Sequence, residues 1–587
     1  MIRQAGWARP FLPVRRLNRL YDGARQHMEI SALDGFLEEL GSRYEVKERD
    51  LELIPRAGAT MVFCNHPFGI FDGMLAGSLL LRVRPDVKIL TNMALDGFPE
   101  LADRCIYVDP LQGPERESVN RKGLRSALEH LYAGGLLVVF PSGEVAHWVT
   151  REWRVREPKW NPNMARMARL SNAVCVPMYI QGRNSLGFQL AGMVHPRLRT
   201  LRLPHELLNK RGLKVEVRIG SPVPPQALAS IRDDEKAISL LRWHSYLLSL
   251  NQTRKQRLLR LAPLHWRPQR PVATEEPASR LRQELDALPA ECRLAQASNF
   301  EVFALTARQA PAIVRELGRL REITFRAAGE GTGKPRDIDR FDAHYTHIVL
   351  WNNEQNELVG AYRLGNVRNI LRRFGMRGLY TATLFRFEDG FFARIPPALE
   401  LGRSFVRQEY QRQFSPLLLL WKGIAAYVVR SPETPVLIGA VSISNDYSPA
   451  SRELMTSFLR SQAAADPKLQ AMVSSKHPPR LSRESRLHQE IFAKALTLET
   501  VNDRVSNMEH DRKGIPILVK QYLKLGGKIL AFNVDAKFAN VIDGLLMVDV
   551  REASPEVLAK YLGKQEAADF LAFHGCLDKA NEPLLQA

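Results

Sequence analysis

The chain has 587 residues, a length that exceeds one ordinary hydrophobic core and predicts two or three domains. About 45% of its residues are hydrophobic and 25% are charged, which is the composition of a globular protein and excludes a disordered one. No uninterrupted apolar run reaches the roughly 18 residues of a membrane-spanning helix, and the N-terminus lacks the apolar segment of a secretory signal. Five scattered cysteines form no CxxC pair and no zinc spacing, so we expect a reduced, cytoplasmic compartment and no metal site.

The formal net charge of +20 is concentrated in one stretch. Residues 151–270 hold 23 Lys and Arg against 7 Asp and Glu, whereas residues 1–150 hold 18 against 19. Such a stretch suits an anionic partner, such as nucleic acid, anionic lipid headgroups or an acidic carrier protein. Few aromatic residues are interleaved with the basic ones and no nucleic-acid module is recognisable, so nucleic acid is not the expected partner. A solvated basic face without a partner is the alternative interpretation.

Hydrophobic periodicity predicts an α/β fold for the first part of the chain. Apolar residues at helical spacing predict helices within residues 10–50. Short apolar or β-branched runs then predict strands, with helical stretches such as 120–133 and 163–170 between them; the strand runs are 61–64, 87–91, 105–108, 136–140 and 174–180. This alternation predicts a layered fold with a largely parallel sheet, in which sites lie at the carboxyl ends of strands.

A second α/β pattern begins near residue 300, after a basic helical stretch at 239–261 and a proline-rich segment at 262–280. It consists of a strand at 301–305, a helix at 311–326, and strands at 346–351 and 357–364. We therefore predict a first α/β domain over residues 1–262, a linker over 263–296, a second α/β domain over 297–575 and a tail over 576–587.

The run NHPFGIFDG at residues 65–73 places an imidazole and a carboxylate within one tight turn. A neutral His66 can take the proton from an attacking hydroxyl, and Asp72 can hold the other ring nitrogen in the required tautomer. The alternative is a His-Pro turn in which Asp72 only caps the following helix.

Two further runs extend this motif: FPSGE at 140–144 and VPMY at 176–179, the latter leading into Gly182-Arg183-Asn184. In this order and spacing, the three runs resemble the phosphate/lysophospholipid acyltransferase family over roughly residues 40–225. The resemblance implies a glycerolipid-acyltransferase-like αβ fold and direct transfer of an acyl group from a thioester to a hydroxyl. It implies that His66 is the general base and Asp72 its orienter, with substrate-binding roles for Asn65, Gly69, Ser142, Gly143, Glu144 and Arg183.

The sequence departs from the family pattern at the positions that hold the acceptor's phosphate. Five residues separate His66 from Asp72 where the family has four, so we expect a bulge at Gly69 to bring the pair together. Ser142 replaces the glutamate of the third motif, and the run CIYVDP at 105–110 lacks the arginine expected in the second. These departures favour an acceptor without that phosphate. Three arginines are alternative phosphate ligands: Arg116, Arg121 and Arg183.

The second half of the chain carries its own set of charged and aromatic residues, namely Arg321, Phe325, Asp337, Asp339, Asp342, Arg363, Glu400 and Arg403. Their order, together with the runs LWKG at 420–423 and VSISN at 441–445, resembles the GNAT-like acyl-transfer fold of autoinducer synthases. It resembles more closely the N-acyltransferases that make ornithine-type aminolipids, over roughly residues 297–575. The run GEGTGKP at 329–335 has neither the spacing nor the Ser/Thr of a Walker motif.

Attack of an amine on a thioester needs a group that accepts the ammonium proton and acidic groups that hold a cationic amino acid. We predict Glu400 as a catalytic residue, and Asp339 and Asp342 as residues that shape the entrance. Substrate-binding roles are predicted for Arg321, Phe325, Asp339, Asp342, Arg363 and Arg403. The alternative is a surface ion-pair network among the aspartates and arginines.

Taken together, the two resemblances predict a bifunctional acyltransferase of bacterial aminolipid synthesis. The C-terminal domain is predicted to N-acylate ornithine or a similar amino acid with a 3-hydroxyacyl thioester, and the N-terminal domain to O-acylate the resulting lyso-lipid. We expect acyl-ACP or acyl-CoA as donor, no bound cofactor, and acyl carrier protein and an anionic membrane surface as partners of a cytoplasmic protein peripheral to the inner membrane. Two alternatives remain. One is a 1-acylglycerol-3-phosphate or lysophospholipid acyltransferase with a non-catalytic GNAT-like domain, and the other is a membrane-binding scaffold of two degenerate enzyme folds.

Overall fold

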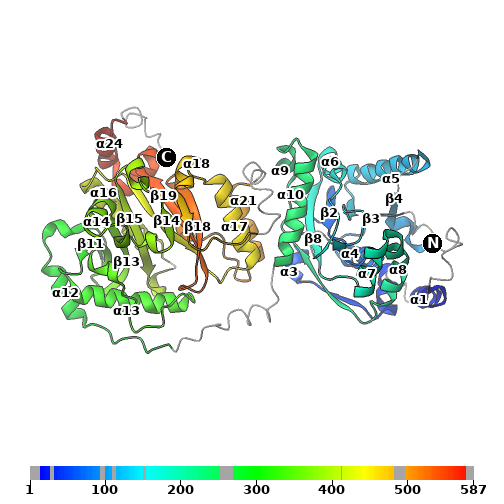
Figure 1. The fold of residues 1–587 in the computed structure, drawn as a ribbon, viewed down its shortest axis with the longest axis horizontal. Helices are drawn as coiled ribbons and strands as arrows, with labels where there is room; N and C mark the ends of the chain where they lie inside the picture. The colour runs from blue at the N-terminus through cyan, green and yellow to red at the C-terminus, as the bar shows by residue number, and fades with distance from the viewer. Residues whose placement is uncertain are drawn as a thin grey trace. The chain divides into compact units, whose positions relative to one another are not determined.

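The computed structural model describes residues 13–26, 32–92, 99–108, 114–149, 154–250, 269–411, 413–481 and 496–576. The chain forms two compact units, and each is built from helices and strands (Figure 1). Unit 1 comprises Met1–Thr253 and Ser482–Arg512, and unit 2 comprises Arg254–Leu481 and Lys513–Ala587. The predicted α/β class is confirmed. Residues 482–512, which the sequence places in the second domain, group with unit 1 instead.

Unit 1 is built on a seven-stranded sheet that is parallel except where β8 meets β9. The five strand runs predicted from the sequence are all strands. In spatial order the strands are β1 (Arg43–Glu45), β9 (Lys214–Ile219), β8 (Val174–Ile180), β2 (Thr60–Cys64), β5 (Leu136–Val139), β3 (Val87–Asn92) and β4 (Cys105–Val108). Strand β1 lies inside the region predicted as helical, because three residues at a sheet edge carry too little periodicity to be read from the sequence.

The helices of unit 1 follow the strands, as the alternation predicted. They are α1 (Val14–Gln26), α2 (Ala32–Glu39), α3 (Glu48–Leu51), α4 (Ile70–Leu81), α5 (Pro114–Tyr132), α6 (Pro162–Leu170), α7 (Leu186–Val194), α8 (Pro196–Leu208), α9 (Pro225–Ala229), α10 (Asp234–Leu247) and α21 (Leu498–Met508). A two-stranded ribbon, β6 (His147–Val149) with β7 (Arg154–Arg156), follows β5. The basic helix predicted over 239–261 is α10 in its first part, and residues 251–261 lie outside the described residues.

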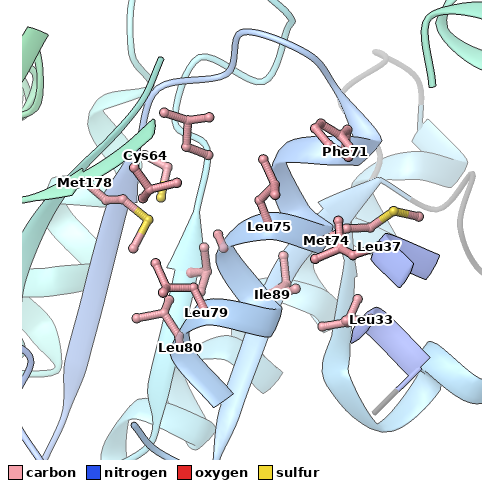
Figure 2. Close-up of a cluster of buried hydrophobic side chains, with 14 of the residues drawn as sticks. Leu33, Leu37, Cys64, Phe71, Met74, Leu75, Leu79, Leu80, Ile89 and Met178 are labelled. Carbon is pink, nitrogen blue, oxygen red and sulfur yellow. The ribbon is translucent and has the colours of Figure 1, made fainter. Parts of the chain in front are cut away.

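Helix α4 is almost entirely buried, which fixes the position of its first turn. Its residues Leu75 and Leu79 pack between the sheet and α2, where they meet Cys64, Ile89 and Leu33 among others (Figure 2). A side chain at Gly77 would come within 2.5 Å of Leu33 and 2.8 Å of Ile89, so only glycine permits this close approach. A helix packed this tightly on both sides holds its N-terminus rigidly against the end of β2.

Unit 2 contains an eight-stranded sheet that is antiparallel except between β15 and β16. In spatial order its strands are β10 (Arg293–Ala297), β11 (Phe300–Thr306), β12 (Thr346–Asn352), β13 (Glu357–Asn366), β15 (Ala398–Val406), β16 (Val436–Ile443), β19 (Val541–Asp549) and β18 (Lys528–Asp535). A separate two-stranded ribbon joins β14 (Phe385–Phe387) to β17 (Val473–Ser475). The predicted strands at 301–305, 346–351 and 357–364 are confirmed.

The longer helices of unit 2 are α12 (Ala278–Asp286), α13 (Pro311–Ala327), α14 (Val367–Phe374), α16 (Phe414–Arg430), α17 (Pro449–Gln462), α22 (Ile517–Lys524), α23 (Pro555–Leu562) and α24 (Lys564–Phe573). The helix predicted at 311–326 is α13. Helix α12 lies within the segment predicted as linker, because Leu281 and Leu285, one helical turn apart, are buried in the hydrophobic core beside α13. The folded part of unit 2 therefore begins before residue 297.

Strands β15 and β16 part from each other halfway along their length. They pair in parallel only from Ala398 with Val436 to Leu401 with Gly439. Beyond that point β15 continues along β13 and β16 continues along β19. A side chain at Gly402, the next residue of β15, would meet nothing within 4 Å. The sheet therefore opens between these two strands, and the residues that follow Leu401 and Gly439 border that opening.

Within the described residues, no helix combines the length and the apolar character needed to cross a bilayer.

Candidate active sites

The predicted histidine–aspartate pair meets at the end of β2 in unit 1. His66 Nδ1 lies 2.9 Å from Asp72 Oδ2; the Asp72 side chain is fully buried, and 17% of the His66 side chain is exposed. The contact is close without the alignment of a hydrogen bond. Catalytic pairs often have this geometry before substrate binds. The extra residue in the motif does not separate the pair.

Asp72 is held in place by the backbone of the turn that it faces. Its Oδ2 accepts hydrogen bonds from the N–H groups of Phe68 and Gly69, each at 2.8 Å. Gly69 has a φ of +105°, a conformation that L side chains rarely adopt. This glycine lets the chain turn back over the start of α4, where the helix dipole favours a carboxylate. Gly69 therefore acts through its backbone.

Asn65 and Glu157 fix the other side of the turn. Asn65 donates from Nδ2 to the carbonyl of Ile180 at 2.9 Å and accepts from the N–H of Ile180 at 2.6 Å. Both ends of its amide are therefore occupied by strand β8, and its role is to position the turn, not to contact substrate as predicted. The N–H of His66 donates to Oε1 of buried Glu157 at 2.8 Å, and Trp160 Nε1 donates to Oε2 at 2.6 Å. Sequence reasoning missed Glu157, which belongs to no motif.

The third motif lies directly beside the histidine. The rings of His66 and Phe140 are 4.7 Å apart between centroids. The N–H of Ala146 donates to the carbonyl of His66 at 2.8 Å. The loop that follows β5 therefore borders the same site as the turn that follows β2, as expected for neighbouring parallel strands.

The polar residues of this loop are engaged locally. The hydroxyl of Ser142 donates to the carbonyl of Glu144 at 2.9 Å, and Gly143 between them has a φ of +64°. The exposed carboxylate of Glu144 lies 2.6 Å from the guanidinium of Arg199 on α8. The loop thus presents a hydroxyl and a paired carboxylate where the related family has the residues that grip phosphate.

The fourth motif leads to one exposed cation and one paired cation. Arg183 is exposed. Beside it, buried Asn184 donates to the carbonyl of Phe68 at 3.2 Å and accepts from Lys210 Nζ at 2.8 Å. Lys210 also lies 3.2 Å from Glu206, and burial lowers its pKa. Arg183 is therefore the cation of this motif that is available to a ligand. Arg121 is exposed on α5, and the side chain of Arg116 lies outside the described residues.

In unit 2 the predicted aspartates and arginines form a single network, and it is buried, not superficial. Asp342 Oδ1 lies 3.0 Å from Arg321 and 3.2 Å from Arg363. Asp339 lies 2.7 Å from Arg363 and 3.6 Å from Arg403. Asp337 lies 3.7 Å from Arg403. Phe325, one turn beyond Arg321 on α13, packs half-buried against the hydrophobic core.

The charges of this network hold one another ionised. Although burial opposes it, the guanidiniums of Arg321 and Arg363 lower the pKa of Asp342 to about 2. Burial, followed by the charge of Arg321, lowers the pKa of His347 to about 4. A neutral His347 donates from Nε2 to the carbonyl of Asp342 at 3.1 Å. Asp342 is therefore ionised and His347 neutral near neutral pH, so these two groups keep fixed charge states.

Two arginines of the network hold one tyrosine between them. The guanidiniums of Arg363 and Arg403 lie 5.4 Å and 5.2 Å from the centroid of the Tyr380 ring, within cation–π range. Arg403 follows the last paired residues of β15 and has a φ of +50°, which is unusual for a side chain of this size. The positive φ marks a locally strained backbone just beyond the last residue of β15 that pairs with β16.

Glu400 is fully engaged in holding the segment that carries Tyr380. The Tyr345 hydroxyl donates to Glu400 Oε2, the N–H of Tyr380 donates to the same oxygen at 3.2 Å, and the N–H of Thr381 donates to Oε1 at 2.6 Å. Only 1% of Glu400 is exposed. This carboxylate therefore orients the segment at 380–381 and has no free oxygen for the catalytic role that we predicted.

A different carboxylate, Asp543, lies on β19, the strand that pairs with β16. It stands opposite Ser442 in the β16–β19 pairing, and the Ser442 hydroxyl donates to its Oδ1 at 2.7 Å. Burial, together with the neighbouring carboxylates of Asp535 and Glu330, raises the pKa of Asp543 to about 7. Among the described residues, no Lys or Arg lies within 4 Å of it.

Sequence reasoning missed Asp543. The available signal was a single acidic residue in an otherwise apolar strand, VIDGLLMV. Glu330 belongs to the same acidic group. The Ser444 hydroxyl bonds to it, and its pKa is raised mainly by burial and further by the charge of Asp446. We call Asp543, Asp535, Glu330 and Asp446 the acidic group of unit 2.

Comparison with known proteins follows this division. A family described as "Acyltransferase" matches residues 36–253, and a family described as "Acetyltransferase (GNAT) domain" matches residues 320–422. The chain is 32% identical over 277 residues to a glycine N(alpha)-acyltransferase of Bacteroides thetaiotaomicron, covering 44% of this chain and 80% of that protein. It is 24% identical over 217 residues to a lyso-glycine lipid O-acyltransferase of Phocaeicola vulgatus, covering 36% and 75%.

Among solved structures, the 1-acyl-sn-glycerophosphate (LPA) acyltransferase PlsC of Thermotoga maritima matches 40% of this chain and 81% of its own, with 17% identity and a TM-score of 0.25. The sequence matches thus identify two acyltransferase domains in one chain.

The buried network of unit 2 predicts a specific acid sensitivity. Asp342 has a lowered pKa in the folded state, so its contribution is present above pH 4 and is lost as the pH falls toward 2; it amounts to about 2 kcal/mol. We expect Asp342→Asn to cost about 3–5 kcal/mol at pH 7, because Arg321 and Arg363 lose their shared counter-ion. Calorimetric unfolding of the full chain at pH 7 and pH 3 measures both effects.

The matched control is Glu552→Gln, which removes an exposed ion pair with Lys528 and should cost under about 1 kcal/mol. Equal destabilisation by the two variants, or an unchanged acid sensitivity in Asp342→Asn, would show that the network does not stabilise unit 2.

Proposed function

We propose that this chain, which belongs to the bacterial acyltransferase family of the glycine N(alpha)-acyltransferases, builds a diacylated amino-acid lipid by two successive acyl transfers. The observation that carries the proposal is the presence of both domains in one chain, whose relatives are named separately for N-acylation and for O-acylation. Unit 2 supplies the N-acyl product, and unit 1 acylates its hydroxyl group.

The first transfer joins an amine to a 3-hydroxyacyl thioester in unit 2. The amine attacks the thioester carbonyl, the C–N bond of the amide forms, the C–S bond breaks, and the thiol of acyl carrier protein or coenzyme A leaves. The ammonium form of the substrate must first lose a proton. Asp543 is the proton acceptor, because it is buried beside Ser442 of β16 and no Lys or Arg among the described residues pairs with it. A pKa near 7 suits that role.

The residues around the opening position the reactants. Arg403 and Arg363 provide fixed positive charge beside Tyr380, where a carboxylate or the oxyanion of the thioester is stabilised. Glu400 keeps Tyr380 in that place, as a positioning residue. Asp339 and Asp342 pair with Arg363, and Asp339 also faces Arg403. Arg321 is the second cation paired with Asp342.

The amino acid substrate has a second positive charge. Asp535, Glu330 and Asp446 are the other carboxylates of the acidic group. An amino acid with a neutral side chain requires no acidic residue besides the proton acceptor, so three further carboxylates favour a second positive charge on the substrate. Their combined field favours a diamino acid such as ornithine over glycine.

The second transfer takes place at His66 in unit 1. His66 accepts the proton of the 3-hydroxyl, that oxygen attacks a second acyl thioester, an ester bond forms and the thiol leaves. Asp72 holds the imidazole tautomer and stabilises the imidazolium. The lyso-lipid acceptor carries no phosphate, which agrees with the paired Glu144 and the short Ser142 in the third-motif loop. Arg183 meets the carboxylate of the amino-acid headgroup.

Positively charged residues attract the acyl carrier protein that brings the donor, and they attract the membrane surface. The excess of Lys and Arg over 151–270 attracts acidic acyl carrier protein and anionic lipid headgroups to a peripheral protein. A lysophosphatidic acid acyltransferase assay separates this proposal from an ordinary glycerolipid acyltransferase, since we expect little transfer to that acceptor.

Replacing the base of unit 1 should interrupt the sequence of reactions at its midpoint. We expect His66→Ala to lower O-acylation roughly 10²- to 10⁴-fold, because the acceptor hydroxyl loses its proton acceptor. Lipid mass spectrometry of cells that express the full chain should then show the mono-acylated amino acid in place of the diacylated lipid. His510→Ala, which alters an exposed histidine of unit 1, is the matched control. Diacylated lipid at the unaltered level in His66→Ala contradicts the assigned base.

The pH dependence of N-acylation reports on Asp543. Its carboxyl is protonated below pH 7 and ionised above it, so kcat/KM should rise through about pH 7 and then level off. We expect Asp543→Asn to lower kcat/KM roughly 10²-fold or more and to abolish that rise. Glu552→Gln, three residues beyond the end of β19, should retain both the rate and the profile. A rise that persists in Asp543→Asn assigns the proton acceptor to another group.

Selectivity among amino acids tests the acidic group. Asp535→Asn keeps an oxygen acceptor for the N–H of Lys537 and removes one negative charge. We expect the ratio of kcat/KM for ornithine to that for glycine to fall about tenfold, because one attraction to the second amine is lost. Preference of the unaltered enzyme for glycine would remove the diamino-acid assignment and leave the two transfers intact.

A further inference from the structure

Helices α7 and α8 form a hairpin, spanning residues 186–208, that turns an apolar face to solvent. Leu186, Leu190, Met193 and Val194 recur at spacings of four, three and one, which is one face of α7. Their exposed fractions run from 46% to 76%, and Leu198 on α8 is 43% exposed. A stripe of this kind normally faces a core. Here it is the densest group of exposed large apolar residues in the described chain.

The packing of the hairpin prevents this stripe from turning inward. The opposite face of α7 buries Phe188 and Gln189, and Gln189 accepts a hydrogen bond from the N–H of Trp148 at 2.8 Å. The side chains of α8 lie directly against two glycines of α7: Arg202 over Gly187 and Arg199 over Gly192. The helices lie side by side in unit 1 (Figure 1). The inner face is therefore already occupied, and none of the described residues of unit 1 covers the outer stripe.

The hairpin is attached directly to the catalytic turn. Leu203 of α8 lies against Gly69, whose added side chain would come within 3.1 Å of it. Arg199 of α8 pairs with Glu144 of the third-motif loop. The apolar stripe thus belongs to the same rigid body as His66, so whatever covers it is brought next to the site of O-acylation.

The charge around the stripe is positive. Between residues 183 and 211 the chain has six Lys and Arg and a single Glu. Arg183, Arg202 and Arg211 are exposed, whereas the single Glu, Glu206, is fully buried. An apolar face bordered by cations complements an anionic lipid leaflet, into which the apolar side chains enter while the guanidiniums meet headgroups.

We propose that the outer face of the α7–α8 hairpin inserts into the anionic leaflet of the membrane and delivers unit 1 to its lipid acceptor. This inference rests on the proposed O-acylation of a membrane lipid. It names the docking surface as Leu186, Leu190, Met193, Val194 and Leu198, with Arg183, Arg202 and Arg211 at its border. The acceptor then enters the site from the bilayer beside Gly69, without crossing water.

The test compares vesicle binding by the full chain and by the double variant Leu190→Ser, Met193→Ser. Vesicles of phosphatidylcholine with phosphatidylglycerol, and vesicles of phosphatidylcholine alone, are sedimented with each protein. We expect the unaltered chain to bind the anionic vesicles more tightly, and the variant to bind them at least tenfold more weakly, since two apolar side chains no longer leave water (about 1.4 kcal/mol per tenfold).

Two controls keep the test decisive. Leu170→Ser removes an exposed leucine at the end of α6, 56% exposed, and should leave vesicle binding unchanged. N-acylation by unit 2, measured with water-soluble substrates in the double variant, reports that the chain is folded, because substitutions at exposed positions cost little stability.

The outcomes separate the docking surface from the proposed function. Vesicle binding that is equal in the unaltered chain and the double variant overturns the docking surface. The docking surface is also overturned if the unaltered chain forms a dimer without lipid, and the variant loses that dimer while it still binds vesicles. In that case a second copy of the chain covers the stripe. His66-dependent O-acylation of a detergent-dispersed lyso-lipid tests the function independently, because that acceptor needs no bilayer.

Discussion

The site of unit 1 depends on one carboxylate oxygen. Asp72 Oδ2 accepts from two backbone N–H groups of the turn and lies beside the imidazole of His66. Because Asp72 is also the third residue of α4, the position of the histidine is set by a helix whose remaining residues are buried in the core. The core, the helix and the turn therefore hold one another in a single fixed arrangement. An extra residue in the turn is tolerated because Gly69 adopts a positive φ, so the spacing in sequence changes while the geometry at Asp72 does not.

Unit 2 buries charged side chains and compensates for their lost hydration by pairing them with opposite charges. Its aspartates and arginines are removed from water, and each is stable there only because an opposite charge lies within a few ångströms. The network thereby fixes Arg363 and Arg403 near the ring of Tyr380, and Glu400 fixes the segment that carries that ring. Asp543 is the exception, since it is buried without a paired cation. A buried carboxylate without a paired cation gains and loses its proton near neutral pH. A base that accepts a proton from an ammonium group needs this property.

The two units handle the two nucleophiles of the proposed pathway according to their chemistry. A hydroxyl must lose its proton as it attacks, so unit 1 presents an imidazole within a turn, partly open to solvent. An ammonium group must lose its proton before it attacks, so unit 2 presents a carboxylate in a buried acidic group. In the proposed pathway, the 3-hydroxyl that unit 1 acylates is introduced by the acyl chain that unit 2 transfers. One chain with both activities would make its own acceptor, and the proposed docking surface beside His66 would keep that acceptor in the membrane.

The sequence by itself determined five strands of the first sheet and three of the second, the α/β class and the pairing of His66 with Asp72. These features arise from local periodicity and from motifs whose residues are close in the chain. The sequence also predicted that Asn65 binds substrate and that Glu400 is catalytic. Both predictions rest on a polar residue within a motif, and a motif does not reveal what that side chain contacts. Only the tertiary structure showed that strand β8 occupies the amide of Asn65 and that three donors occupy the carboxylate of Glu400.

The tertiary structure alone also decided the features that depend on residues far apart in the chain. Glu157 supports His66 across 91 positions, and Ser442 meets Asp543 across 101. The same holds for the apolar stripe of α7, whose spacing in sequence equals that of an ordinary core-facing helix. Periodicity gives the face that is apolar but not the direction in which that face points, because direction is set by what packs against the other side. In this hairpin the other side holds Phe188, Gln189 and the arginines of α8, and that packing leaves the apolar residues facing outward.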